Sequence, residues 1–334
     1  MTERNHSLDL LRIIAMFMIL TVHFFGWGGA VNQLTFSDKN YYFVMPLYFI
    51  SQIGNTLFFL LSGYFSGGKL RVKSLLSLER KTAFYAVVIS AIALLTGING
   101  DISWMYVVKC EFPVLFNRYW FVSVYVILSL LAPVLVRGLE RCSPKVILAA
   151  IVALLAHNTF LYSANMTLLQ GLHMFVIGYY LRRYDPLKKI KKWVVLLMYV
   201  GSVALYAGER FFSLRMEIEH TALDEGLRYT LITLMAVLLL EFFTKLDIKA
   251  QWPSKISGNV LAVYLITVCP AIYHQLYENW LHIDMLCREW WFGGYYLLIN
   301  IMLFTGCVLI DKIVSKINTL EVKTWIKVKK KLFY

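Results

Sequence analysis

The stretch LDLLRIIAMFMILTVHF (residues 8–24) is apolar enough to enter a lipid bilayer, yet it carries Asp9, Arg12 and His23. An ionisable side chain in the hydrocarbon core costs about 3 kcal/mol or more, and such side chains usually face the protein interior. Three of them in one predicted span therefore favour a functional surface over a plain membrane anchor.

The composition of the whole chain is that of a membrane protein. Of its 334 residues, 59% are hydrophobic and 16% are charged, against about 25% charged in an ordinary soluble domain. A soluble core cannot bury so much apolar surface, whereas a bilayer can. The sequence has no internal repeat and no linker long enough to separate two domains. We therefore expect one all-α integral membrane domain over residues 1–334.

Apolar runs near the length of a spanning helix, roughly 17–25 residues, predict a polytopic bundle of about ten transmembrane helices. These runs cover residues 8–27, 41–66, 82–98, 120–137, 145–162, 168–182, 193–207, 227–244, 256–276 and 291–314. Most Lys and Arg residues fall in the loops on one side of these spans, together with a basic tail over residues 315–334. By the positive-inside rule, the N- and C-termini are both expected to be cytoplasmic.

The net charge of +13 follows from that asymmetry, because a basic cytosolic face is attracted to anionic lipid. No platform of aromatic and basic residues supports nucleic-acid binding, so none is expected. The five cysteines show no metal-ligand spacing, and we expect no metal site. The sequence does not decide whether Cys110 and Cys287 form a disulfide. Every histidine except His6 falls in the opposite half of the spans or in its loops, where an imidazole can transfer protons near neutral pH.

Arg12 and His23 are predicted to project from one face of the first helix. Eleven residues at about 100° each make three turns and a small remainder, and they separate the two side chains by about 16 Å along the axis. Asp9 lies three residues before Arg12 and can pair with it. The alternatives are that Arg12 reaches the lipid head groups as an anchor, and that His23 only hydrogen-bonds a neighbouring helix.

A polar stripe on the second span supports an interior lining. Ser51, Asn55 and Ser62 fall on one face of this predicted helix. The alternative is ordinary hydrogen bonding between helices, which membrane bundles use widely.

Three segments together resemble the acyltransferase-3 family of membrane-bound acyltransferases. They are LDLLRIIAMFMILTVHF with its Arg-x10-His spacing, NTLFFLLSGYFSGG (55–68) and RYWFVSVYVILSLLAPVL (118–135). The resemblance covers essentially the whole chain, and it is closest to members that O-acetylate capsule, exopolysaccharide or O-antigen.

The resemblance implies an O-acyltransferase in the bacterial plasma (inner) membrane. Such an enzyme moves an acyl group from cytosolic acyl-CoA, usually acetyl-CoA, to a hydroxyl of a glycan or a lipid-linked glycan on the other side. Acetyl-CoA is then a co-substrate, and no cofactor is bound permanently. Membrane lipid is the expected surrounding partner. Arg12 and His23 are implied to be the essential pair, with His23 as general base.

The chain departs from the family pattern in two places. Many members carry an Arg-Arg-x-x-Arg run where this chain has only Arg80 and Lys81, which we nevertheless expect to help Arg12 bind the donor phosphates. Many members also have a second histidine in a late span, where this chain has Thr267. That leaves His23 as the main candidate for the base. Direct transfer is the simpler expectation, although an acyl-histidine intermediate is chemically feasible.

The remaining candidates are expected to support the reaction or to bind the acceptor. Oxyanion or supporting polar roles fall to Asn55, Ser62, Tyr119 and His173. Acceptor-side roles fall to Glu111, Trp120 and Tyr125. Each has a plainer interpretation: His173 as a satisfied histidine of the bundle, Glu111 as an ion-pair partner of Arg118, and Trp120 as part of an interfacial aromatic belt.

Two other functions stay open from the sequence alone. A glycan flippase or transporter would use the polar stripe to line a path, but such proteins usually show repeated halves with interrupted helices, and none are evident. A polysaccharide polymerase would need a large outer loop, which the chain lacks.

Overall fold

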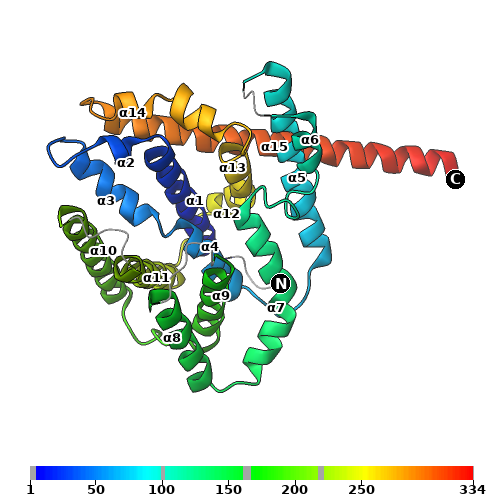
Figure 1. Ribbon diagram of the computed structural model, residues 1–334. Coiled ribbons are helices and arrows are strands. Elements are labelled where there is room, and N and C mark those ends of the chain that lie inside the picture. The colour runs from blue at the N-terminus through cyan, green and yellow to red at the C-terminus, as the bar shows by residue number, and fades with distance from the viewer. Residues whose placement is uncertain (1–4, 99–101, 161–166, 217–221, 334) are drawn as a thin grey trace.

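The computed structural model describes residues 5–98, 102–160, 167–216 and 222–333, and within these ranges the chain is helical with no strand. Residues 161 and 162 of the predicted fifth span lie outside this part, as do the side chains of the tail beyond residue 317. The all-α prediction is therefore confirmed for the described residues. Their helices pack around the N-terminal helix, and one long C-terminal helix extends away from the bundle (Figure 1).

The helices follow one another along the chain with short connections. They are α1 (His6–Trp27), α2 (Ala30–Gln33), α3 (Tyr41–Ser51), α4 (Gly54–Tyr64), α5 (Val72–Thr96), α6 (Trp104–Lys109), α7 (Trp120–Glu140), α8 (Pro144–Phe160), α9 (Thr167–Tyr184), α10 (Lys192–Arg215), α11 (Ala222–Thr244), α12 (Trp252–Ile256), a 3-10 turn η1 (Ser257–Asn259), α13 (Val260–Thr267), a π-helical segment η2 (Gln275–Trp280), α14 (Ile283–Leu286) and α15 (Phe292–Phe333).

Helix α1 is the central element. It packs against α3, α4, α11, α12, α13 and α15, and its position among them is visible in Figure 1. Its start is fixed locally, because the Asn5 side chain accepts a hydrogen bond from the backbone N–H of Leu8 at 3.0 Å. It ends at Trp27 with Gly28 as its C-cap, and Gly29 follows with φ of 79°, a conformation that favours glycine. The prediction of a helix over residues 8–27 is confirmed.

In the part of the chain that the structure describes, six helical segments are long and apolar enough to cross a membrane. They are His6–Trp27, Tyr41–Tyr64, Trp120–Glu140, Lys192–Arg215, Asp224–Thr244 and Phe292–Ile317, and a shorter apolar helix covers Pro144–Phe160. The expected count of about ten is thus not confirmed among the described residues, although each predicted span contains helix. Helix α5 departs because its first half reads VKSLLSLERK, which is too polar for the membrane interior.

The predicted ninth span, residues 256–276, is corrected by the structure. Instead of one helix, this stretch contains η1, then α13, which ends at Thr267, and then a turn before η2. Pro270 follows the end of α13 by three residues, and proline cannot continue a helix because it lacks the N–H and its ring clashes with the preceding turn. The second predicted span is likewise divided at Gln52 and Ile53 into α3 and α4.

The cysteines play no covalent part in the fold. All five are free thiols, so the disulfide that the sequence left open between Cys110 and Cys287 is not formed. The bundle is held instead by helix packing, most tightly between α4 and α9. A Cβ atom on Gly63 would lie 1.9 Å from the Phe175 carbonyl oxygen, and one on Gly178 would lie 2.0 Å from the Leu60 carbonyl oxygen.

We expect Gly178→Ala to destabilise the protein by about 1–3 kcal/mol, because the added methyl group overpacks the contact between α4 and α9. The matched control is Gly201→Ala in α10, where nothing lies within 4 Å of the new Cβ. Thermal unfolding in detergent measures both variants. Equal melting temperatures for the two would contradict the close contact.

Candidate functional site

The face of α1 that carries Arg12 and His23 borders two internal cavities. Arg12 lines the first, which has a volume of about 410 Å³, and His23 lines the second, of about 320 Å³. We call them the Arg12 cavity and the His23 cavity. Ile19 lines both, so the two cavities approach each other at this side chain of α1. Arg12 and His23, which were predicted to project from one face of the first helix, thus line two different cavities that share Ile19.

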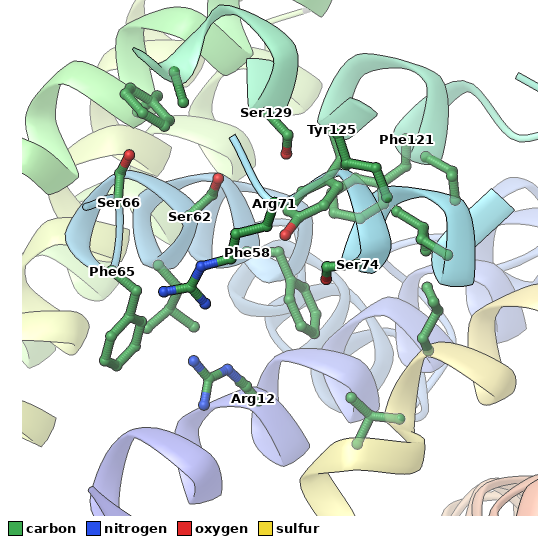
Figure 2. A pocket seen from close by; sticks show the side chains of 18 of the residues that line it. Arg12, Phe58, Ser62, Phe65, Ser66, Arg71, Ser74, Phe121, Tyr125 and Ser129 are labelled. Carbon is green, nitrogen blue, oxygen red and sulfur yellow. The ribbon is translucent and has the colours of Figure 1, made fainter. Parts of the chain in front are cut away.

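The Arg12 cavity is positively charged and rich in hydroxyl groups. Its cations are Arg12, Lys69 and Arg71, and no Asp or Glu lines it among the described residues. Serines from α4, α5, α7 and η1 also line it, namely Ser62, Ser74, Ser129 and Ser257, together with Ser66 between α4 and α5. Figure 2 shows the guanidinium groups of Arg12 and Arg71 facing one another, with Ser62 and Ser66 near them. Guanidinium and hydroxyl donors in this arrangement suit a phosphate-bearing ligand.

Arg12 is held in place by a buried carboxylate. Its Nη1 atom lies 2.6 Å from Oδ1 of Asp9, whose side chain is 2% exposed. The Ser254 hydroxyl donates to the other Asp9 oxygen at 2.6 Å, which ties this pair to α12. The Phe65 ring packs against the guanidinium at 4.8 Å. Asp9 thus occupies one donor of Arg12, and the predicted pairing of these residues is confirmed.

His23 is oriented by stacking in the second cavity. Its ring lies 4.0 Å from that of Trp27, one helical turn later, with an interplanar angle of 13°. The ring of Tyr277, a residue of η2, lies 6.3 Å from the His23 ring. Nδ1 of His23 is buried with no hydrogen-bond partner among the described residues. Because Nδ1 is enclosed, Nε2 is the nitrogen available for chemistry in the cavity.

The walls of the His23 cavity are mainly neutral and polar. Ser51 from α3, Asn55 from α4 and Gln170 from α9 line it, with Gln52 from the break between α3 and α4. At this break, the Tyr206 hydroxyl donates to Gln52 Oε1 at 2.9 Å and so fixes the orientation of the Gln52 amide group. The stripe predicted on the second span is divided: Ser51 and Asn55 face His23, whereas Ser62 faces Arg12.

The other candidates from the sequence are distributed between the cavities and the bundle interior. Trp120, 38% exposed, lines the His23 cavity, and Tyr125 lines the Arg12 cavity. Tyr119 lines neither, because its hydroxyl donates to the Leu265 carbonyl oxygen at 2.9 Å. His173 is fully buried behind the His23 cavity, with Nδ1 2.7 Å from the hydroxyl of Tyr229.

Three candidates lie apart from both cavities. Arg80 is exposed on α5, and Glu111 is exposed in the segment between α6 and α7. The Lys81 ammonium group lies 2.7 Å from the buried carboxylate of Asp311 on α15. The Tyr85 hydroxyl also donates to this carboxylate, at 2.9 Å. Lys81 therefore joins α5 to α15, and the structure does not bring Arg80 or Lys81 together with Arg12.

Sequence reasoning missed two pairs of charged residues. Lys69 and Arg71 supply the cations of the Arg12 cavity beside Arg12 itself, and the Gly67-Gly68 step just before them was the available signal for a turn back toward α1. Glu225 and Arg228, an ion pair on α11, line the His23 cavity. Nothing in their local sequence separates them from a solvated helix face.

One comparison with known proteins gives a match. A family model described as an acyltransferase domain matches residues 5–312. No curated protein and no solved structure matches the chain.

Proposed function

The chain belongs to the acyltransferase-3 family, and from this premise we propose that it is a membrane O-acyltransferase that moves an acetyl group from cytosolic acetyl-CoA to a glycan hydroxyl across the membrane. Acyl transfer in general follows from the family. The donor, the acceptor and the catalytic residues are the proposal, and one observation carries it: a cationic cavity and a histidine-lined cavity meet at Ile19 along one face of α1.

Each cavity suits one half of the reaction. The phosphates of coenzyme A would bind in the Arg12 cavity, where Arg12, Arg71 and the serine hydroxyls can donate charge-assisted hydrogen bonds. The thin pantetheine arm would pass Ile19 and bring the thioester to His23, about 16 Å along the helix. Phosphates need not cross the membrane, because only the acyl group is passed on.

His23 would act as the general base. Its Nε2 takes the proton of the acceptor hydroxyl while the hydroxyl oxygen forms an ester bond to the acyl carbon. The carbon–sulfur bond breaks, and the proton then passes from His23 to the leaving coenzyme A thiolate. Asn55 is the sequence-predicted oxyanion donor that shares the cavity with His23, so its amide is proposed to stabilise the charge that develops on the carbonyl oxygen.

The passage between the cavities gives a direct test. We expect Ile19→Phe to lower acetyl transfer at least about tenfold, because the larger ring blocks the pantetheine arm and displaces the thioester from His23. Proteoliposomes with acetyl-CoA trapped inside and glycan outside measure the transfer by mass spectrometry of the glycan. Ile19→Val is the control and should keep the activity of the wild type. Unchanged transfer by a folded Ile19→Phe protein would rule out this route.

A further inference from the structure

The His23 cavity contains one ion pair, and its surroundings bear on which acceptor can enter. Glu225 and Arg228 lie one turn apart on α11 and pair with each other. Their side chains are 14% and 26% exposed, and both line the cavity. Among the described residues that line the cavity, Glu225 is the carboxylate and Arg228 is the guanidinium. The two charges compensate, so the cavity offers no unopposed cation to an anionic ligand.

A second ion-paired group lies next to Glu225. Asp224 precedes Glu225 in the chain and accepts a hydrogen bond from Arg210 Nη1 at 2.8 Å. Glu209 lies 3.9 Å from the same Arg210 atom. Arg210 is thus engaged by carboxylates of the bundle and does not line the cavity, so it offers no pairing partner to a carboxylate that enters there.

The remaining polar groups of the cavity suit uncharged hydroxyls. Gln52 accepts from Tyr206 through its oxygen, which leaves its amide N–H groups to donate into the cavity. Asn55 and Gln170 add amides that can donate and accept. Trp120 supplies an aromatic face of the kind on which a sugar ring stacks. A ligand with many hydroxyls and no charge can use all of these groups.

We propose that the His23 cavity binds an uncharged sugar and excludes acidic sugars, with the Glu225–Arg228 pair as the specificity-determining element; this inference rests on the function proposed above. A sugar hydroxyl can donate to Glu225 and accept from Arg228 without separating them. A sugar carboxylate would compete with Glu225 for Arg228 and place two carboxylates at one partly exposed guanidinium, which disfavours the acidic acceptor.

The two cavities would then select by charge in opposite ways. The Arg12 cavity has three cations and, among its described lining residues, no carboxylate, so it attracts polyanions. In the His23 cavity the cation among the described lining residues is paired with Glu225, so the cavity offers polyanions no such attraction. This contrast keeps the coenzyme A phosphates at one end of α1 and the acceptor at the other.

Two isosteric acceptors that differ only in charge provide the test. Purified protein in detergent is given acetyl-CoA and either p-nitrophenyl β-D-glucuronide or its C6 carboxamide, and acetylated product is measured by mass spectrometry. We expect wild-type protein to prefer the amide at least about tenfold in kcat/KM. Glu225→Gln should narrow or reverse that preference, because Arg228 can then pair with the sugar carboxylate. Arg228→Gln should raise the KM for the amide and give no gain on the acid.

Glu278→Gln is the matched control, because it removes a carboxylate that is 47% exposed and pairs with His274 away from the cavity. It should leave the preference unchanged. Equal use of the two glycosides, or preference for the acid, would overturn the inference, and so would a Glu225→Gln protein with the wild-type preference. If Glu225→Gln does not fold, the result with Arg228→Gln decides.

The readouts separate this inference from the function on which it rests. Acetylation of membrane glycan without acetylation of either glycoside would overturn the inference about the His23 cavity and leave the acyltransferase function standing. No acetyl transfer to any acceptor would overturn the proposed function itself.

Discussion

Replacing His23 with glutamine is expected to lower acetyl transfer by about 10²- to 10⁴-fold, the range usually lost with a general base. Glutamine keeps a polar side chain in the His23 cavity but cannot take the proton of the attacking hydroxyl. Acetyl-CoA should still bind with nearly unchanged affinity, because the Arg12 cavity lies about 16 Å away along α1. The loss should therefore appear in kcat rather than in the KM for acetyl-CoA.

The matched control for this substitution is His274→Gln. His274 is 53% exposed and pairs with Glu278 at 2.5 Å, away from the cavity that His23 lines. It should keep the activity of the wild type, and so separate loss of one particular imidazole from loss of any histidine. The role of His23 as base is wrong if His23→Gln protein, correctly inserted and folded, acetylates its acceptor at more than about a tenth of the wild-type rate.

The features that could be predicted from the sequence are those that depend on a single helix and not on its packing. Helix α1 was placed correctly from its apolar run, and the Asn5 cap and the turn at Gly28 and Gly29 that bound it in the structure are local as well. The shared face of Arg12 and His23 follows from the helical repeat alone. The Asp9–Arg12 pair is likewise a contact between side chains three residues apart. None of these conclusions needs any knowledge of tertiary packing.

The residues around Arg12 could not be predicted in the same way. Arg71 and Arg80 are close in sequence, but α5 begins at Val72, earlier than expected, so Arg80 is carried more than two turns along the helix and out to the surface. Lys81 is drawn instead to Asp311, which is distant in the chain and buried on α15. Which basic residue reaches a cavity depends on where a helix starts and on partners far away in sequence.

The walls of the His23 cavity depend on irregular backbone in the same manner. Gln52 reaches its partner Tyr206 because the second span is broken at that point, whereas a continuous helix was expected over residues 41–66. The interruption of the ninth span had a visible cause in Pro270, and that signal was available in the sequence. Breaks in apolar runs are thus where further polar site residues are best sought in this chain.

Arg12→Ala is expected to weaken acetyl-CoA binding by about 10- to 150-fold, because a hydrogen bond to a charged group contributes about 1.5–3 kcal/mol. The lost interaction is with phosphate, so acetylpantetheine, which carries no phosphate, should bind the variant and the wild type nearly equally. Arg71→Ala should show the same pattern, since the two guanidinium groups face each other across the Arg12 cavity (Figure 2). Equilibrium binding in detergent measures all of these affinities.

Arg80→Ala distinguishes two phosphate sites: Arg12 with Lys69 and Arg71, as the structure supports, and Arg12 with Arg80 and Lys81, as expected from the sequence. Arg80 is exposed and lines neither cavity, so its removal should change acetyl-CoA affinity by less than about twofold, the size of a screened surface charge effect. Because Asp9 stays buried in Arg12→Ala protein and keeps its bond to Ser254, the melting temperature of each variant must accompany its affinity. If Arg80→Ala weakens acetyl-CoA binding as much as Arg12→Ala, with both proteins folded, the phosphates bind outside the Arg12 cavity. The proposed path of the pantetheine arm along α1 would then be wrong.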